Sequence, residues 1–202
     1  MAESDPIREI LVSQDCLQSE ELQTEQNAAI DKVEKLIRTW EGRLVSSKDL
    51  KSESEKYCKL VCIGSHKLGV HLKGGDIDLL CIAPSWISRQ DFNVNLVELL
   101  QADESVSQLR PVPHARVPVI KFALGWVDFD LQFARLEVQR RVEEDQDFSI
   151  KGLVSDPQCQ ASLAGHLDTM ALLAVVPDIL TFQSTLAGIK VWADRRGVHG
   201  YR

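Results

Sequence analysis

Two aspartates one residue apart, Asp76 and Asp78, stand directly in front of an apolar run that ends at Ala83. On an extended strand, residues i and i+2 point to the same face, so these two carboxylates lie roughly 7 Å apart at the backbone. Carboxylates this close repel each other unless a cation lies between them. Mg²⁺ takes one or two carboxylates together with substrate phosphates. Asp130, in the run 126–134, is a third candidate ligand, and three such carboxylates on one sheet face suit a two-metal site for phosphoryl transfer.

A glycine–serine pair, Gly64-Ser65, follows the apolar run 59–63 and precedes a segment rich in lysine and histidine. Glycine lets backbone N–H groups approach an anion, and a serine hydroxyl adds another donor. Each signal is weak alone, because a bare Asp-x-Asp is more often a turn, a helix cap or a solvated edge, and Gly-Ser is more often a plain turn. Together, in this order and followed by a third aspartate, they predict phosphate contacts beside a carboxylate cluster.

Hydrophobic periodicity places these residues on an α/β framework. In chain order, the pattern predicts a helix over 19–41 capped by Ser19, strands over 59–63 and 76–83, a helix over 88–101, and strands over 117–124 and 126–134. Gly125 separates the last two strands and indicates a hairpin. The final strand alternates. One face carries Val127, Phe129, Leu131 and Phe133, and the other carries Trp126, Asp128, Asp130 and Gln132.

The chain changes character after residue 136. Residues 137–160 are charged and irregular, and a helical pattern follows. It is clearest over 178–196, where Asp178 stands in the first turn and two arginines stand in the last. The expected parts are an amino-terminal segment over 1–18 that packs against the helical region, an α/β domain over 19–136, and an incomplete helical domain over 137–202.

Composition narrows the class of protein. The chain has 202 residues, a formal net charge of −7 and five cysteines without metal-binding spacing. Cys62 and Cys81 stand in apolar runs, which indicates reduced, buried thiols in an intracellular protein. The acidic amino terminus is no signal peptide, and no apolar run approaches the ~20 residues that span a bilayer. Because the net charge is negative, a polyanion must be bound by local groups or by other parts of a longer protein.

Three segments resemble the eukaryotic poly(A) polymerases of the polymerase-β-like nucleotidyltransferase superfamily. They are GSHKLGVHLKGGDIDLLCIAP, VPVIKFALGWVDFDLQFARL and LAGIKVWADRRGV, in that family's order and at about its spacing. The resemblance covers essentially the whole chain. It implies a polymerase-β-like palm over 19–136, with a mixed β-sheet flanked by helices, and part of a helical central domain over 137–202.

The resemblance also implies a reaction, which is the addition of AMP from ATP to an RNA 3′ end in mRNA polyadenylation in the nucleus. The metals are Mg²⁺ or Mn²⁺, the partners are cleavage and polyadenylation factors, and no membrane is involved. The residues matching the family's metal-binding catalytic aspartates are Asp76, Asp78 and Asp130. The residues matching its nucleotide contacts are Ile63, Gly64 and Ser65 at the triphosphate turn, Val117 near the adenine, and Lys190 at a phosphate.

The chain departs from the family's pattern at three positions. His66 and His199 stand where the family usually has tyrosine, and Ala164 stands where it usually has asparagine. One alternative is therefore a truncated, catalytically silent relative that binds nucleotide or partner proteins. Another is a nucleotidyltransferase with a different base preference.

Plain structural interpretations remain for other residues. Trp126 and Trp192 are expected to be core aromatics. Without the resemblance, Lys190 is expected to be a solvated side chain on an amphipathic helix. His71 and Lys73 are either loop residues or groups that help to steer a triphosphate.

Overall fold

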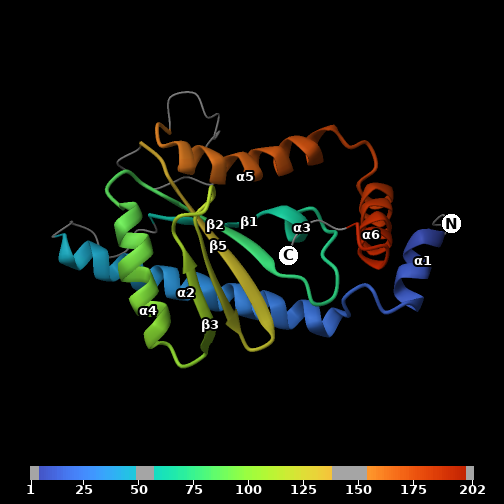
Figure 1. The fold of residues 1–202 in the computed structure, drawn as a ribbon, viewed down its shortest axis with the longest axis horizontal. Coiled ribbons are helices and arrows are strands. Elements are labelled where there is room, and N and C mark those ends of the chain that lie inside the picture. Colours follow the sequence, from blue (N-terminus) through green and yellow to red (C-terminus); the bar gives the residue numbers. More distant parts are fainter. Residues whose placement is uncertain (1–4, 49–56, 138–153, 199–202) are drawn as a thin grey trace.

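The computed structural model describes residues 5–48, 57–137 and 154–198. Five strands in these ranges form one mixed sheet in the order β1-β2-β5-β4-β3 (Figure 1). The strands are β1 (Lys59–Cys62), β2 (Ile77–Ala83), β3 (Val106–Val112), β4 (Val119–Leu124) and β5 (Val127–Arg135). β2 and β5 run parallel, and the other neighbouring pairs are antiparallel. The expected α/β class with a mixed sheet is confirmed.

Helices precede, interrupt and follow the sheet in sequence. They are α1 (Pro6–Ser13), α2 (Glu20–Ser47), α3 (Gly64–Lys67), the π-helix η1 (Asp91–Leu96), α4 (Val97–Ala102), α5 (Pro157–Val175) and α6 (Ile179–Arg195). The Ser19 hydroxyl accepts a hydrogen bond from the Leu22 amide and caps α2 as expected, but the helix extends six residues beyond Glu41 to Ser47. The helix expected over 88–101 is present over 89–102, with the π-helix η1 in its first half, and β3 is a strand that the sequence pattern does not predict.

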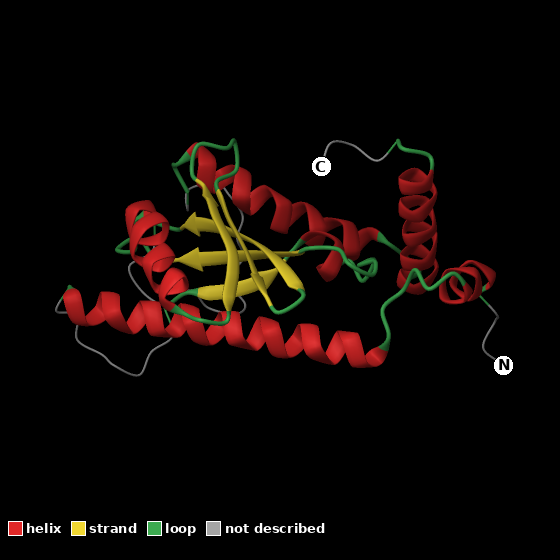
Figure 2. Ribbon diagram, turned by 60° about the horizontal axis from the view of Figure 1, so that its bottom comes forward, coloured by secondary structure: helices red, strands yellow, loops and turns green. Residues whose placement is uncertain are grey.

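The two faces of the sheet have different coverings. One face packs on α2, η1 and α4 in a core that includes Trp40, Phe92 and Phe129, each at most 1% exposed. Each large apolar side chain buried in this way stabilises the fold by about 1.5–3 kcal/mol. The other face packs on α5 through a smaller cluster around Leu80 and Leu163. Figure 2 shows the sheet between the long helix α2 and the helix α5.

The β4–β5 hairpin determines which side chains of β5 point into the core and which point to the opposite face of the sheet. Gly125 turns it with a φ of 62°, a left-handed conformation that favours glycine. In β5, Phe129 and Leu131 point into the core, while Asp128 and Asp130 point to the opposite face. The predicted hairpin and the alternation of side chains along β5 are confirmed. Asp128 and Asp130 therefore lie on the sheet face that also packs on α5.

Two aromatic expectations are wrong. Trp126 is 45% exposed and Trp192 is 56% exposed, so neither is a core residue. Trp126 lies in the hairpin turn rather than in the strand, and its indole N–H donates to Glu25 at 2.6 Å. Trp192 lies outside the face of α6 that is buried at Ser184 and Ala187.

The helix α1 lies beside α6, apart from the sheet (Figure 2). The Ser184 hydroxyl donates to the Asp5 carboxylate, and Gly188 lets Ile7 approach so closely that a Cβ there would meet its Cγ2 at 3.1 Å. Within the three described ranges, no helix combines the length and the apolar character needed to cross a membrane.

Candidate active site

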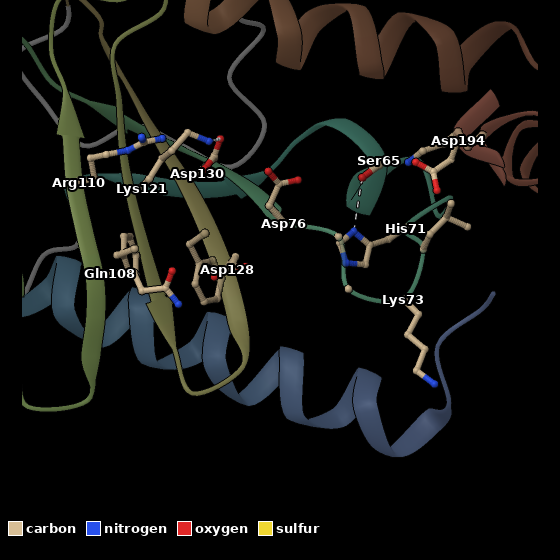
Figure 3. A pocket seen from close by; sticks show the side chains of 16 residues that line it. Ser65, His71, Lys73, Asp76, Gln108, Arg110, Lys121, Asp128, Asp130 and Asp194 are labelled. Atoms are coloured by element: carbon tan, nitrogen blue, oxygen red, sulfur yellow. Dashed lines mark hydrogen bonds and ion pairs between the residues drawn. The ribbon is translucent and has the colours of Figure 1, made fainter. Parts of the chain in front are cut away.

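A cavity of about 880 Å³ opens on the sheet face that carries Asp128 and Asp130. One of its walls holds Ser65 and His71, from α3 and the loop that precedes β2. The opposite wall holds Arg110 of β3 and Lys121 of β4. Figure 3 shows Asp76 between these two walls. The cavity therefore places a carboxylate centre between two groups of polar and basic side chains.

The three predicted aspartates come together through the parallel pairing of β2 with β5. In that register Asp78 lies directly opposite Asp130. Asp76 stands one residue before the start of β2, two residues from Asp78 and on the same side of the chain. Asp76 and Asp130 line the cavity. Burial, followed by the charges of Asp76 and Asp130, raises the pKa of Asp78 to about 6.

This donor set fits a hard divalent cation. Carboxylate oxygens are the ligands that Mg²⁺ prefers, and the raised pKa of Asp78 reflects negative charge crowded in a poorly hydrated place. The Lys121 ammonium forms an ion pair with Asp130 and neutralises part of this charge. Within the described ranges, no three His, Cys, Asp or Glu side chains already form a metal-binding group. Binding of one ion by all three aspartates would therefore require their side chains to rearrange, with Asp130 paired to Lys121 through one of its two carboxylate oxygens.

The predicted phosphate turn lies against the aspartates. Ile63 is buried and its amide donates to the Asp78 carbonyl at 3.0 Å, so the chain leaving β1 passes directly beside β2. Gly64 begins α3 with a φ of 59°, and a Cβ placed on it would lie 2.7 Å from Asp78 Oδ2. This position therefore needs glycine for its conformation and for its space. Ser65 follows and lines the cavity.

Lys190 reaches the same cavity from α6. It is half-buried, and its ammonium donates to the Val70 carbonyl at 3.2 Å. Burial lowers its pKa, while the charges of Asp76 and Asp78 act in the opposite direction. The expectation of an ordinary solvated lysine is therefore wrong, because Lys190 lines a cavity beside two carboxylates. Lys73 also lines the cavity, and it forms an ion pair with Asp15.

His71 lies in the wall of the cavity that also holds Ser65. Its Nε2 lies 3.2 Å from the amide nitrogen of Gln26, a buried residue of α2, and its Nδ1 lies 3.5 Å from the Ser65 hydroxyl (Figure 3). Burial, followed by His66 and Lys190, lowers the pKa of His71 to about 4. The imidazole is therefore neutral at neutral pH and connects the long helix to the serine of the turn.

The remaining predicted positions lie away from the lining. Val117 is half-buried in the segment before β4 and does not line the cavity. Ala164 lies on α5, partly exposed, and His66 lies on α3 with its ring 5.6 Å from that of His71. His199 is outside the described residues.

The sequence interpretation missed the residues of the opposite wall. Lys121 was detectable, because it stands between the core residues Ile120 and Phe122 in a strand and must face the other side. Gln108 and Arg110 were not detectable in this way, because β3 itself was not predicted.

Known proteins are similar to this chain over most of its length. The family model described as "Poly(A) polymerase nucleotidyltransferase domain" matches residues 1–176. Nuclear poly(A) polymerase 1 of Arabidopsis thaliana is 36% identical over 172 residues, which is 83% of this chain and 24% of that protein. The poly(A) polymerase of Dictyostelium discoideum is 31% identical over 200 residues, which is 97% of this chain and 25% of that protein.

A solved structure of the Cid1 poly(U) polymerase bound to MgATP has a similar fold. It superposes with a TM-score of 0.61 at 18% identity, over 94% of this chain and 47% of that chain. The expected polymerase-β-like nucleotidyltransferase fold is confirmed. The chain spans about a quarter of the length of the two curated relatives.

Proposed function

Because the chain belongs to the poly(A) polymerase nucleotidyltransferase domain family, we propose that it transfers AMP from ATP to the 3′ end of an RNA. The observation that carries the proposal is the pairing of β2 with β5. It sets Asp78 opposite Asp130, with Asp76 and Lys190 in the same cavity. Two-metal phosphoryl transfer uses carboxylates that hold the metal ions beside groups that hold phosphates, and we assign these roles to the three aspartates and to Ser65 and Lys190.

Asp76, Asp78 and Asp130 would hold Mg²⁺ or Mn²⁺. When bound, such ions lower the pKa of an attacking hydroxyl and neutralise the triphosphate. The Gly64 turn brings the chain close to Asp78, and the Ser65 hydroxyl points into the cavity as a donor for phosphate oxygens.

Lys190 of α6 would bind the triphosphate together with Ser65. Its half-buried ammonium, held by the Val70 carbonyl, retains further donors for an anion. Ile63 fixes the approach of the turn through its amide bond to the Asp78 carbonyl. Val117 is proposed as the apolar contact of the adenine, from the segment that leads into β4.

The biological setting follows from the relatives. Nuclear mRNA polyadenylation is proposed because a relative at 36% identity is named a nuclear poly(A) polymerase. Recruitment by cleavage and polyadenylation factors belongs to the same proposal.

A second candidate function is nucleotide binding without transfer. Two observations favour it, which are the Lys121–Asp130 ion pair at a proposed metal ligand and Ala164 in place of the family's asparagine. In that case, the chain binds ATP with Mg²⁺ and does not extend a primer.

One experiment separates the two functions. The chain is incubated with a labelled RNA primer, Mg²⁺ or Mn²⁺, and each of the four nucleoside triphosphates in turn, and ATP binding is measured by calorimetry. Transfer predicts extension that prefers ATP and is abolished by Asp130→Ala. Asp168→Ala, an exposed residue of α5 outside the cavity lining, is the matched control and retains extension. Extension that survives Asp130→Ala contradicts the proposed site, and ATP binding without extension supports the second candidate.

A further inference from the structure

We propose that the wall of the cavity opposite Ser65, where Gln108, Arg110 and Lys121 stand beside Asp128, binds the phosphodiester backbone of the acceptor RNA, with Arg110 as its principal contact. This inference rests on the proposed function and assigns a ligand to side chains that the predicted site does not include. All three residues line the cavity, and Figure 3 shows them on the side of Asp76 away from Ser65.

Arg110 ends a row of charges that crosses four strands. It lies opposite Lys121 in the β3–β4 ladder, and Lys121 lies opposite Asp130 in the β4–β5 ladder. Asp130 in turn lies opposite Asp78 in the β5–β2 ladder. Directly opposed residues project to the same face of a sheet. Two cations and then two carboxylates therefore stand side by side on the cavity face.

A β-bulge produces this alignment. Ser107 pairs with Ala123, but the register shifts by one residue before Arg110 pairs with Lys121. Continued in the Ser107–Ala123 register, the ladder would set Leu109 opposite Lys121 and turn Arg110 to the other face. The extra residue is what brings the guanidinium to the cavity, and bulges recur beside active sites for this kind of re-aiming.

The bulge includes a strained residue. Gln108 has a φ of 54°, and Asp15 is the one other non-glycine residue with a positive φ among the described residues. A left-handed conformation of this kind persists only where the surroundings impose it, and it is concentrated at functional sites. Gln108 itself is exposed and lines the cavity, so its amide is available to a ligand.

The direction of the reaction decides which substrate meets this wall. In phosphoryl transfer the attacking and leaving oxygens lie roughly in line, on opposite sides of the transferred phosphorus. If Ser65 and Lys190 hold the triphosphate, the leaving pyrophosphate lies on their side of the aspartates. The attacking 3′-hydroxyl then approaches from the side of Arg110, and the RNA backbone behind it passes along β3 and β4.

Charge supports the same choice. Lys121 is already paired with Asp130, whereas Arg110 is exposed and makes no ion pair within the ranges that the structure describes. A chain with a net charge of −7 cannot attract RNA through its overall field, so a local free guanidinium has a large effect. Arginine also suits phosphate, because its planar fork donates two parallel hydrogen bonds.

The test measures binding of a short, labelled, single-stranded RNA to the 202-residue chain by fluorescence anisotropy over a range of salt concentrations. Arg110→Ala is expected to weaken RNA binding about tenfold and to reduce the slope of log K against log salt by about 0.7, the value for one lost contact with single-stranded phosphate. Arg110→Lys keeps the charge and most of the slope. The matched control is Arg116→Ala, an exposed arginine in the β3–β4 connection outside the cavity lining.

The outcomes separate this inference from the proposed function. Equal effects of Arg110→Ala and Arg116→Ala, or no RNA binding by the wild-type chain, overturn the RNA-binding wall. An increased KM for ATP with unchanged RNA affinity in Arg110→Ala also overturns it, because Arg110 would then serve the nucleotide. The expected loss of RNA affinity in a chain that shows no primer extension supports the wall and contradicts AMP transfer by this chain.

Discussion

Replacing Gly64 by alanine tests the close approach on which the site depends. The new Cβ would lie 2.7 Å from Asp78 Oδ2, so this carboxylate must move by several tenths of an ångström. The left-handed φ of 59° adds about 1–2 kcal/mol of strain for an L-residue. The clash adds about 1–3 kcal/mol, as overpacking does in other interiors. We therefore expect a total destabilisation of about 2–5 kcal/mol.

Gly125→Ala is the matched control. Gly125 has nearly the same φ, 62°, but nothing lies within 4 Å of its Cβ position. It should show the backbone strain alone, about 1–2 kcal/mol, and retain primer extension. The difference between the two variants in the free energy of unfolding, measured by urea denaturation, isolates the contact with Asp78.

The functional readout is primer extension at saturating ATP. A displacement of a reacting group by about 1 Å costs about 10²-fold in rate, so a shift of several tenths of an ångström in Gly64→Ala should cost about tenfold even where the variant remains folded. Equal unfolding free energies for the two alanine variants, together with normal extension by Gly64→Ala, would refute the close approach of Gly64 to Asp78 of β2.

The remaining predictions concern charge. The pKa of Asp78 is raised from 3.8 to about 6, so the folded protein holds a proton that the unfolded chain releases, and without metal its stability should fall as pH rises from about 4 to about 6. Asp78→Asn should remove that dependence in urea denaturation at several pH values, and an unchanged profile would contradict the crowding of carboxylates. Lys190→Ala should weaken ATP binding about tenfold in calorimetry while leaving RNA affinity unchanged, since a charge-assisted hydrogen bond to phosphate is lost. Glu41→Ala should destabilise the fold by about 3 kcal/mol in urea denaturation, because the buried Glu41 carboxylate pairs with Arg38 at 2.7 Å and accepts the Tyr57 amide, and a loss below about 1 kcal/mol would contradict this role.

The sequence was informative wherever a local pattern reports burial. The helix that begins after Ser19, the hairpin at Gly125 and the alternation through Asp130 follow from residue spacing, because each face of these elements meets either the core or the cavity. The apolar pattern of one strand does not show which other strand it pairs with, however. The pairing of Asp78 with Asp130 joins strands about fifty residues apart, and only the assembled sheet defines it.

The part of the cavity wall on β3, at Gln108 and Arg110, could not be predicted from the sequence for a related reason. The bulge at Gln108 breaks the two-residue period of β3, and Pro111 within the strand is a signal against a strand. The core positions expected for Trp126 and Trp192 are wrong for a different reason, because an aromatic residue type does not by itself determine burial. Their exposure depends on a turn and on one face of a helix, which the local pattern did not resolve.

One face of the sheet packs partly on α5 and opens partly to the cavity. This arrangement explains why the pKa of Asp78 is raised. Along β2, Asp78 is followed on the same face by Leu80 and Ile82, which are buried in the cluster beneath α5. The carboxylate therefore stands at the edge of an apolar region, where burial raises its pKa before any neighbouring charge acts. The charges of Lys121 and Lys190 already lower the pKa of Asp78 in part, and a divalent cation held by the aspartates would offset this cost further. Core packing thus contributes to the electrostatics of the proposed metal site, and substitutions that expose Leu80 or Ile82 to water should weaken its metal affinity although neither side chain belongs to the site.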